Sequence, residues 1–130
     1  MSEFSKALSV SSSGLRAQAT RLRHLSENIS NADTPGYRRK LISFESAFKT
    51  GEGVSEVIPG RVKLDRTDLE KIYDPTHPMA DETGYHDGTN VDLMIELADA
   101  REAQRSYEAN LKMFEQTRKM SSGLMDLLRK

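Results

Sequence analysis

The feature that most constrains the fold is a seven-residue repeat of large apolar side chains near the start of the chain. The repeated positions are Leu8, Leu15, Leu22 and Ile29, with Leu25 between the last two. A repeat of this period places its side chains on one face of an α-helix, as in a coiled coil. Polar residues interrupt the interleaved positions at Ser11 and Gln18. We therefore expect a long helix whose packing seam is too weak for a stable isolated coiled coil.

A second amphipathic segment closes the chain. Asn90 is the predicted N-cap, and a periodic apolar stripe then runs toward the last residue. The stripe residues expected to pack are Leu97, Tyr107, Leu111, Phe114 and Leu124. The two helices are expected to pair along their stripes as a coiled-coil-like bundle.

The segment between the helices has a different composition. Residues 33–90 hold all four Pro and six of the eight Gly. Short runs of β-forming residues occur at Val54–Ile58, Arg61–Leu64 and Leu69–Tyr73. Runs this short, separated by turn residues, predict a small hairpin or meander followed by a loop over Thr76–Thr89.

The predicted fold is mainly α, with two long terminal helices and a small irregular β-hairpin and loop region between them. The chain divides into residues 1–32, 33–90 and 91–130. The connector is too polar to cover both helices, so their remaining apolar surface needs partners outside the chain. This favours a self-assembling structural protein.

Composition excludes several other classes. The chain has no Cys, and its 19 basic and 20 acidic residues nearly cancel, which argues against nucleic-acid binding. No apolar run is long enough for a membrane span or for the core of a signal peptide, so we expect any export to proceed without a cleaved leader. No catalytic constellation, metal site or cofactor site can be identified, and the His and Asp residues between 74 and 87 are interpreted as a solvated acidic loop.

A short motif ends the first helix. It consists of Asn31, Ala32, Asp33, Thr34, Pro35, Gly36 and Tyr37. Asn31 suits a helix C-cap, and Pro35-Gly36 suits the central positions of a type II turn, with Gly36 at positive φ. From the residues alone, a generic helix-stop remains an alternative to an assembly motif.

The motif also resembles the signature of the bacterial flagellar axial proteins, in which a Thr-Pro-Gly-Tyr turn follows an N-terminal helix. Two further stretches, Tyr73–Tyr85 followed by Asn90-Val91-Asp92, and Arg105–Asn110, resemble the FlgC type of proximal rod proteins. The chain departs from that pattern at His86-Asp87-Gly88-Thr89, where apolar residues and a Pro are usual.

The resemblance implies a structural subunit of the flagellar basal-body rod, which transmits torque and continues the export channel. It implies assembly in the periplasm with copies of the chain and other rod proteins, after passage through the flagellar type III export apparatus. Phe4 and Leu8 resemble an element that this apparatus reads, although both also fit the helix seam. The alternatives are the sister rod protein type FlgB and, from another class, a cytoplasmic helical adaptor.

Overall fold

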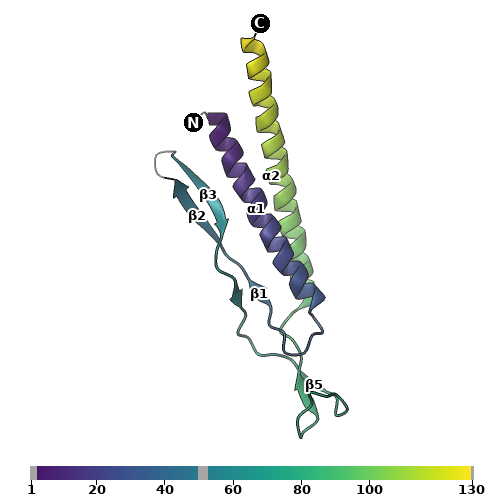
Figure 1. Cartoon of the computed structure of the whole chain (residues 1–130). Helices are drawn as coiled ribbons and strands as arrows, with labels where there is room; N and C mark the ends of the chain where they lie inside the picture. Colours follow the sequence, from purple (N-terminus) through teal and green to yellow (C-terminus); the bar gives the residue numbers. More distant parts are fainter. Residues whose placement is uncertain (1–2, 50–52, 130) are drawn as a thin grey trace.

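The computed structural model describes residues 3–49 and 53–129 of the chain, and it consists of two long helices with small sheets beside and below them (Figure 1). Helix α1 spans Glu3–Ser30 and helix α2 spans Leu93–Leu128. The helices run antiparallel, side by side. Helix α2 is 36 residues long and α1 is 28, so the C-terminal end of α2 continues past the start of α1. The prediction of a mainly α fold with two terminal helices is confirmed.

Local hydrogen bonds explain where the helices end and begin. Both the backbone amide and the side-chain amide of Asn31 donate to the carbonyl of Glu27, at 3.0 and 2.8 Å, which closes α1. Helix α2 is capped by Asp92, whose carboxylate accepts from the amide of Met94 at 3.0 Å. The prediction that Asn90 is the N-cap is wrong, because the cap lies two residues later at Asp92. The Asn90 side chain instead accepts a hydrogen bond from the backbone amide of Arg39, in the segment that follows α1.

Within the described ranges, six short strands form three separate antiparallel pairs. Strand β1 (Lys40–Leu41) pairs with β4 (Lys63–Leu64), β2 (Phe44–Lys49) with β3 (Val54–Pro59), and β5 (Lys71–Tyr73) with β6 (Tyr85–Asp87). Strands β3, β4 and β5 lie within or close to the three predicted runs. Strands β1, β2 and β6 were not predicted, and β6 falls inside the segment expected to be a loop. Strands this short depend on their partners more than on their own composition.

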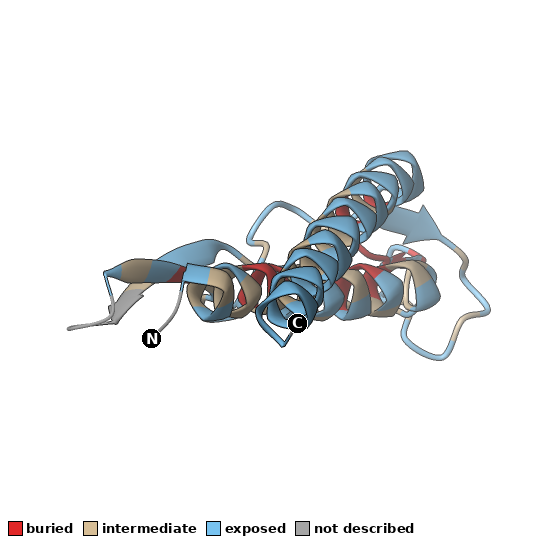
Figure 2. Ribbon diagram, turned by 90° about the horizontal axis from the view of Figure 1, so that it is seen from above, coloured by how far each residue is buried: buried red, intermediate tan, exposed pale blue. Residues whose placement is uncertain are grey.

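The interface between the helices is built from small and polar residues. Ala17 of α1 and Ala103 of α2 are almost completely buried. Gly14 faces Asn110, and a Cβ atom at position 14 would lie 2.9 Å from the Asn110 Oδ1 atom. Small side chains let the two backbones approach closely, so the line of contact follows them. Figure 2 shows the buried residues gathered where the elements meet, while most of α2 is exposed.

The leucine repeat is therefore only partly covered in the single chain. Leu8, Leu15, Leu22 and Ile29 are half-buried, and only Leu25 of the predicted seam is buried. Ser13 accepts a hydrogen bond from Val57 of β3. At about 100° per residue, the side chain of Leu15 points away from that sheet, on the opposite flank of α1.

The predicted stripe on α2 differs from the structure in the same way. Tyr107 and Phe114 are half-buried, but Leu97, Leu111 and Leu124 are exposed in the single chain, Leu97 by 52%. The physical reason is that the close contact at Ala103 and Asn110 turns these larger side chains outward. Whether they pack in an assembly stays a prediction.

Candidate assembly motif

The motif after α1 forms a tight turn that reverses the chain. The amide of Tyr37 donates to the carbonyl of Thr34 at 3.1 Å, with Pro35 and Gly36 between them. Gly36 has a φ of 77°, a region that other residues adopt with strain. The prediction of a Pro-Gly turn with Gly36 at positive φ is confirmed. The Thr34 hydroxyl also donates to the Asn31 side chain at 3.1 Å, which links the turn to the helix end.

The turn is tied to the segment that precedes α2. The amide of Gly36 donates to the carbonyl of Gly88 at 3.0 Å, and the Thr89 hydroxyl donates to the carbonyl of Ala32 at 2.8 Å. A Cβ atom at Gly88 would lie 2.8 Å from the Ile72 Cδ1 atom, so only glycine fits without movement there. Gly88 and Thr89, where the sequence departs from the family pattern, thus make direct contacts with the motif.

Asn28, in the last turn of α1, is completely buried and uses its full hydrogen-bonding capacity. Its amide donates to the Lys40 carbonyl at 3.0 Å and to Glu96 Oε2 at 3.2 Å. Its Oδ1 atom accepts from the Tyr37 hydroxyl at 2.7 Å and from the Lys40 amide at 2.8 Å. One side chain therefore holds together α1, the turn, strand β1 and α2. Burial raises the pKa of the Tyr37 hydroxyl, which keeps it a donor at neutral pH.

Glu96, in the first turn of α2, is also completely buried. Its Oε1 atom accepts from Arg39 Nε at 2.6 Å, and Arg39 Nη1 lies 3.2 Å from Asp65 Oδ2. A buried carboxylate is tolerated only when it is paired and hydrogen-bonded, and both conditions are met here. Hydrogen bonds from Thr67 lower the pKa of Asp65, the second carboxylate beside Arg39.

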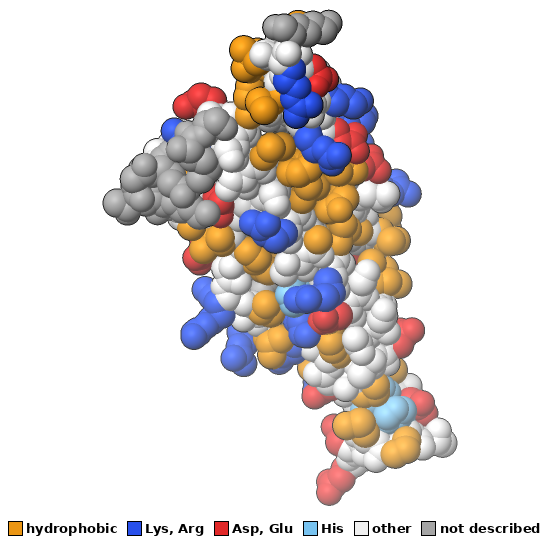
Figure 3. All heavy atoms as spheres, turned by 45° about the horizontal axis from the view of Figure 1, so that its top comes forward, with side chains coloured by type: hydrophobic (Ala, Val, Ile, Leu, Met, Phe, Trp, Pro, Cys, Tyr) orange, Lys and Arg blue, Asp and Glu red, His pale blue; other side chains and the backbone are white. Residues whose placement is uncertain are grey.

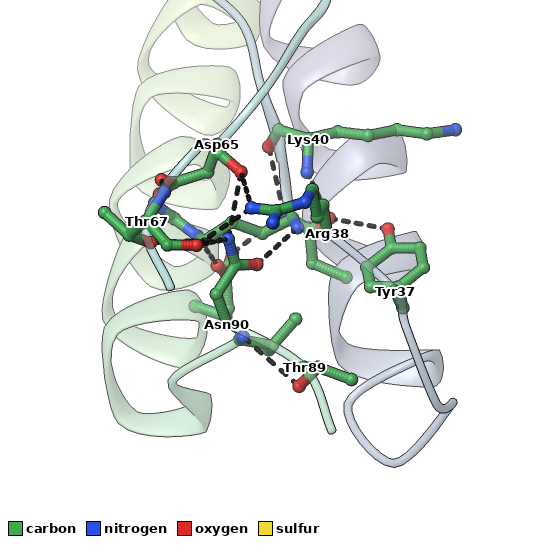
Figure 4. A network of polar contacts seen from close by, with 11 residues as sticks. Tyr37, Arg38, Lys40, Asp65, Thr67, Thr89 and Asn90 are labelled. Carbon is green, nitrogen blue, oxygen red and sulfur yellow. Dashed lines mark hydrogen bonds and ion pairs between the residues drawn. The ribbon is translucent and has the colours of Figure 1, made fainter. Parts of the chain in front are cut away.

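Asn90 and Arg38 close the network from the other side, as Figure 4 shows. The Asn90 Oδ1 atom accepts from the Arg39 amide at 2.8 Å, and its Nδ2 atom donates to the Asp65 and Thr67 carbonyls. Arg38 Nη1 donates to the same two carbonyls, at 3.1 and 2.9 Å. We call the connected set the clasp; it comprises Asn28, Tyr37, Arg39, Asp65, Asn90 and Glu96.

A neighbouring ion pair reinforces the clasp at the surface. Lys40 Nζ lies 2.5 Å from Glu27 Oε2. The ammonium group lowers the pKa of the Glu27 carboxyl, and the carboxylate raises the pKa of Lys40. Both side chains are about a third exposed, so solvent weakens the pair.

The clasp fixes the direction in which the chain leaves α1 and enters α2. All of the residues predicted as an assembly motif, Asn31–Tyr37, lie in the turn, and Asp33, Thr34 and Gly36 are exposed there. Asn28, Arg39, Asp65, Asn90 and Glu96 were not identified as site residues from the sequence. Asn90 was predicted as a helix cap and lies in a stretch that resembles the FlgC type, but neither signal pointed to the clasp.

The other predicted sites lie away from the clasp. Phe4 and Leu8 occupy the first two turns of α1 and are half-buried. Within residues 3–49 and 53–129, no three metal-binding side chains lie close enough to hold an ion. No helix in the same ranges is long and apolar enough to cross a membrane.

Comparison with known proteins matches both ends of the chain. Residues 8–38 fit the family described as flagella basal body rod protein, and residues 82–127 fit the C-terminal family of the flagellar basal body rod FlgEFG proteins. These ranges include the two sides of the clasp, with Asn28 and Tyr37 in one and Asn90 and Glu96 in the other.

Whole relatives are similar along almost their full length. The flagellar basal-body rod protein FlgC of Agrobacterium fabrum is 45% identical, over 99% of this chain and 98% of the relative. FlgC of Aquifex aeolicus is 36% identical over 92% of this chain and 93% of the relative. FlgC of Bacillus subtilis is 32% identical over 88% and 91%.

Proposed function

Because this chain belongs to the FlgC family of flagellar basal-body rod proteins and is a structural subunit of the rod, we propose that it enters the rod through the open apolar faces of α1 and α2. The clasp holds the two helices at a fixed angle, and neighbouring subunits cover the side chains that the single chain leaves exposed.

The observation that carries this proposal is the imbalance between the buried and the exposed apolar residues. The buried hydrophobic residues among those described are Ala17, Leu25 and Ala103. Much larger side chains are exposed along α2, and they include Leu93, Leu97, Met113, Met120, Leu124, Leu127 and Leu128. At about 25 cal/mol per Å² of apolar surface, covering these side chains in an assembly is favourable.

The clasp gives the subunit a mechanical role. The clasp adds a fixed connection at one end of the helix pair, where the buried Asn28 amide donates to Glu96. We propose that residues 1–32 and 91–130 form the axial core and that residues 33–90 lie around it. In this arrangement the subunit transmits torque and continues the export channel.

The proposal extends to location and partners. The subunit assembles in the periplasm with copies of itself and with other rod proteins, after export from the cytoplasm by the flagellar type III apparatus without a cleaved signal. Phe4 and Leu8, on the first two turns of α1, are the proposed export element.

The experiment compares Leu111→Asp with Gln116→Asp in a motile host that lacks the native gene. Both residues are exposed in the single chain, but only Leu111 lies on the apolar stripe. A carboxylate buried in an apolar contact costs several kcal/mol. We expect Leu111→Asp to be exported but absent from isolated basal bodies, and Gln116→Asp to be present. Normal incorporation of Leu111→Asp would contradict the proposed contact face.

A further inference from the structure

The chain around strands β1 and β4 exposes apolar and basic side chains together. Leu41, Val62 and Leu64 are exposed large apolar side chains there. Arg61, Lys63 and Arg66 lie on or beside β4 and are exposed, and the register places Lys63 directly opposite Leu41. None of the three forms an ion pair with another described side chain, in contrast to Arg39 and Lys40 nearby. We call these six residues the basic surface.

A second surface has the opposite charge. Residues 68–87, the acidic tip, include strands β5 and β6 and contain six acidic residues and one basic residue. That one cation, Lys71, is already paired with Asp87. Large side chains are exposed at the centre of the tip, with Tyr73 at 63% and Met79 at 64%.

The acidic tip is held in shape by its own contacts. Asp81 Oδ1 accepts from the backbone amides of Thr83 and Tyr85, at 2.9 and 3.1 Å. Gly84 has a φ of 87°, and a Cβ atom there would lie 2.8 Å from the Tyr73 ring. The Tyr73 and Tyr85 rings pack with their centroids 5.1 Å apart. The tip therefore presents a preformed surface and pays little ordering entropy on binding.

The two surfaces lie on different parts of the molecule. Figure 1 places β5 at the end away from both chain termini, and β1 beside α1. Figure 3 shows Lys and Arg gathered around hydrophobic side chains on the middle of one face, with Asp and Glu around hydrophobic side chains at the narrow end. Each surface exposes both apolar and charged side chains, and the two charges are opposite.

We propose that the acidic tip of one copy docks on the basic surface of a second copy. This inference rests on the proposed function, because it needs copies of the chain to meet in the rod. Complementary charge on one chain favours a second copy over an unrelated partner, since each surface finds its match without another protein. A contact between two different surfaces is heterologous, so it repeats from copy to copy, in a closed ring or along a helical path.

Cysteine cross-linking tests the contact, and the chain offers a clean background because it contains no Cys. The variant carries Val62→Cys on the basic surface and Met79→Cys on the acidic tip. Basal bodies are isolated and treated with a short bifunctional maleimide. We expect a ladder of dimers and larger multimers. The two single-cysteine variants are the controls, because one cysteine per chain cannot propagate a ladder.

The outcomes separate the two proposals. If the chain is missing from basal bodies, the proposed function fails. If the chain is present in basal bodies but the double-cysteine variant gives no ladder beyond the controls, the docking of two copies is overturned. Cross-linking to a different protein alone also overturns it.

Charge reversal provides an independent measurement in the same cross-linking background. Arg61→Glu with Lys63→Glu, or Asp68→Lys with Glu82→Lys, should each lower the multimer yield on the order of tenfold, since two attractions become repulsions. A chain with all four changes has both surfaces reversed and should recover most of the yield. A fourfold variant that stays as weak as the pairs would refute charge complementarity as the basis of the contact.

Discussion

Replacing Glu96 by Ala removes the carboxylate at the centre of the clasp. Arg39 then loses its partner at 2.6 Å, and the amide of Asn28 loses the acceptor at 3.2 Å. Both groups are held inside the structure by other contacts, so neither can turn to water without disrupting the clasp. We expect a large loss of stability from a single exchange of a polar residue.

The magnitude follows from the burial of the pair. The Glu96 side chain is 0% exposed, and breaking a buried ion pair costs about 3–5 kcal/mol. Arg39 is 18% exposed and keeps Asp65 as a second partner at 3.2 Å, which places the loss near the lower limit. About 3 kcal/mol corresponds to a change of roughly a hundredfold in the ratio of folded to unfolded chains.

Urea unfolding of the purified protein, followed by far-UV circular dichroism, measures the free energy of unfolding. The matched control is the double variant Glu96→Leu with Arg39→Met, which removes both charges and restores apolar volume. Asp65 keeps its hydrogen bonds from Thr67 in this variant. We expect the double variant to be more stable than Glu96→Ala, because no buried charge is left unpaired and the remaining loss is the Asn28 amide without its acceptor, about 1–3 kcal/mol.

Two results would refute this reasoning. A Glu96→Ala protein as stable as the native one would show that the carboxylate is not a buried partner of Arg39. A double variant that loses the sum of the single effects would show that the two charges are not coupled.

Three other predictions follow from the same structure. Gly36→Val should reduce rod completion in electron micrographs more than Gly36→Ala, because a β-branched residue at a φ of 77° is strained by about 1–3 kcal/mol; equal rod numbers would make the turn a simple helix-stop. Lys40 lowers the pKa of Glu27 from its usual 4.5, so the ion pair stabilises the fold above that pH and the stabilisation is lost as the pH falls further. Glu27→Gln should therefore make the free energy of unfolding depend less on pH in the acid range. An unchanged dependence on pH would contradict a role for the pair in stability. Amides at residues 118–128 should exchange rapidly in the dilute protein, because nearly all of these side chains are exposed, and strong protection in the single chain would contradict the need for neighbours.

Local patterns in the sequence were enough to predict the two helices and the turn at Pro35-Gly36. Helix periodicity and turn chemistry depend on residues close together in the chain, so the sequence alone carries these signals. The same local logic failed for the cap of α2, because Asn90 is occupied by contacts with Arg39 and Asp65, which lie 51 and 25 residues earlier in the chain.

The packing between the helices could not be predicted from the leucine repeat. Periodicity shows which face of a helix is apolar, but it does not show which face meets the partner within the same chain. Gly14, Ala17 and Ala103 define the contact because they let the backbones approach, and small residues carry little weight in a hydrophobic pattern. The clasp was missed for a related reason, since a buried carboxylate such as Glu96 looks like an ordinary charged residue at a helix start.

The unequal lengths of the helices have a consequence for the strength of the shaft. Helix α2 has eight residues more than α1, which at 1.5 Å per residue gives an overhang of about 12 Å beyond the end of the pair. If subunits stack end to end, each overhang lies beside the helices of the next layer, so consecutive layers overlap. Layers that overlap in this way have no flat interface along which they can separate. Breaking the rod by bending would therefore require separating helices that lie side by side.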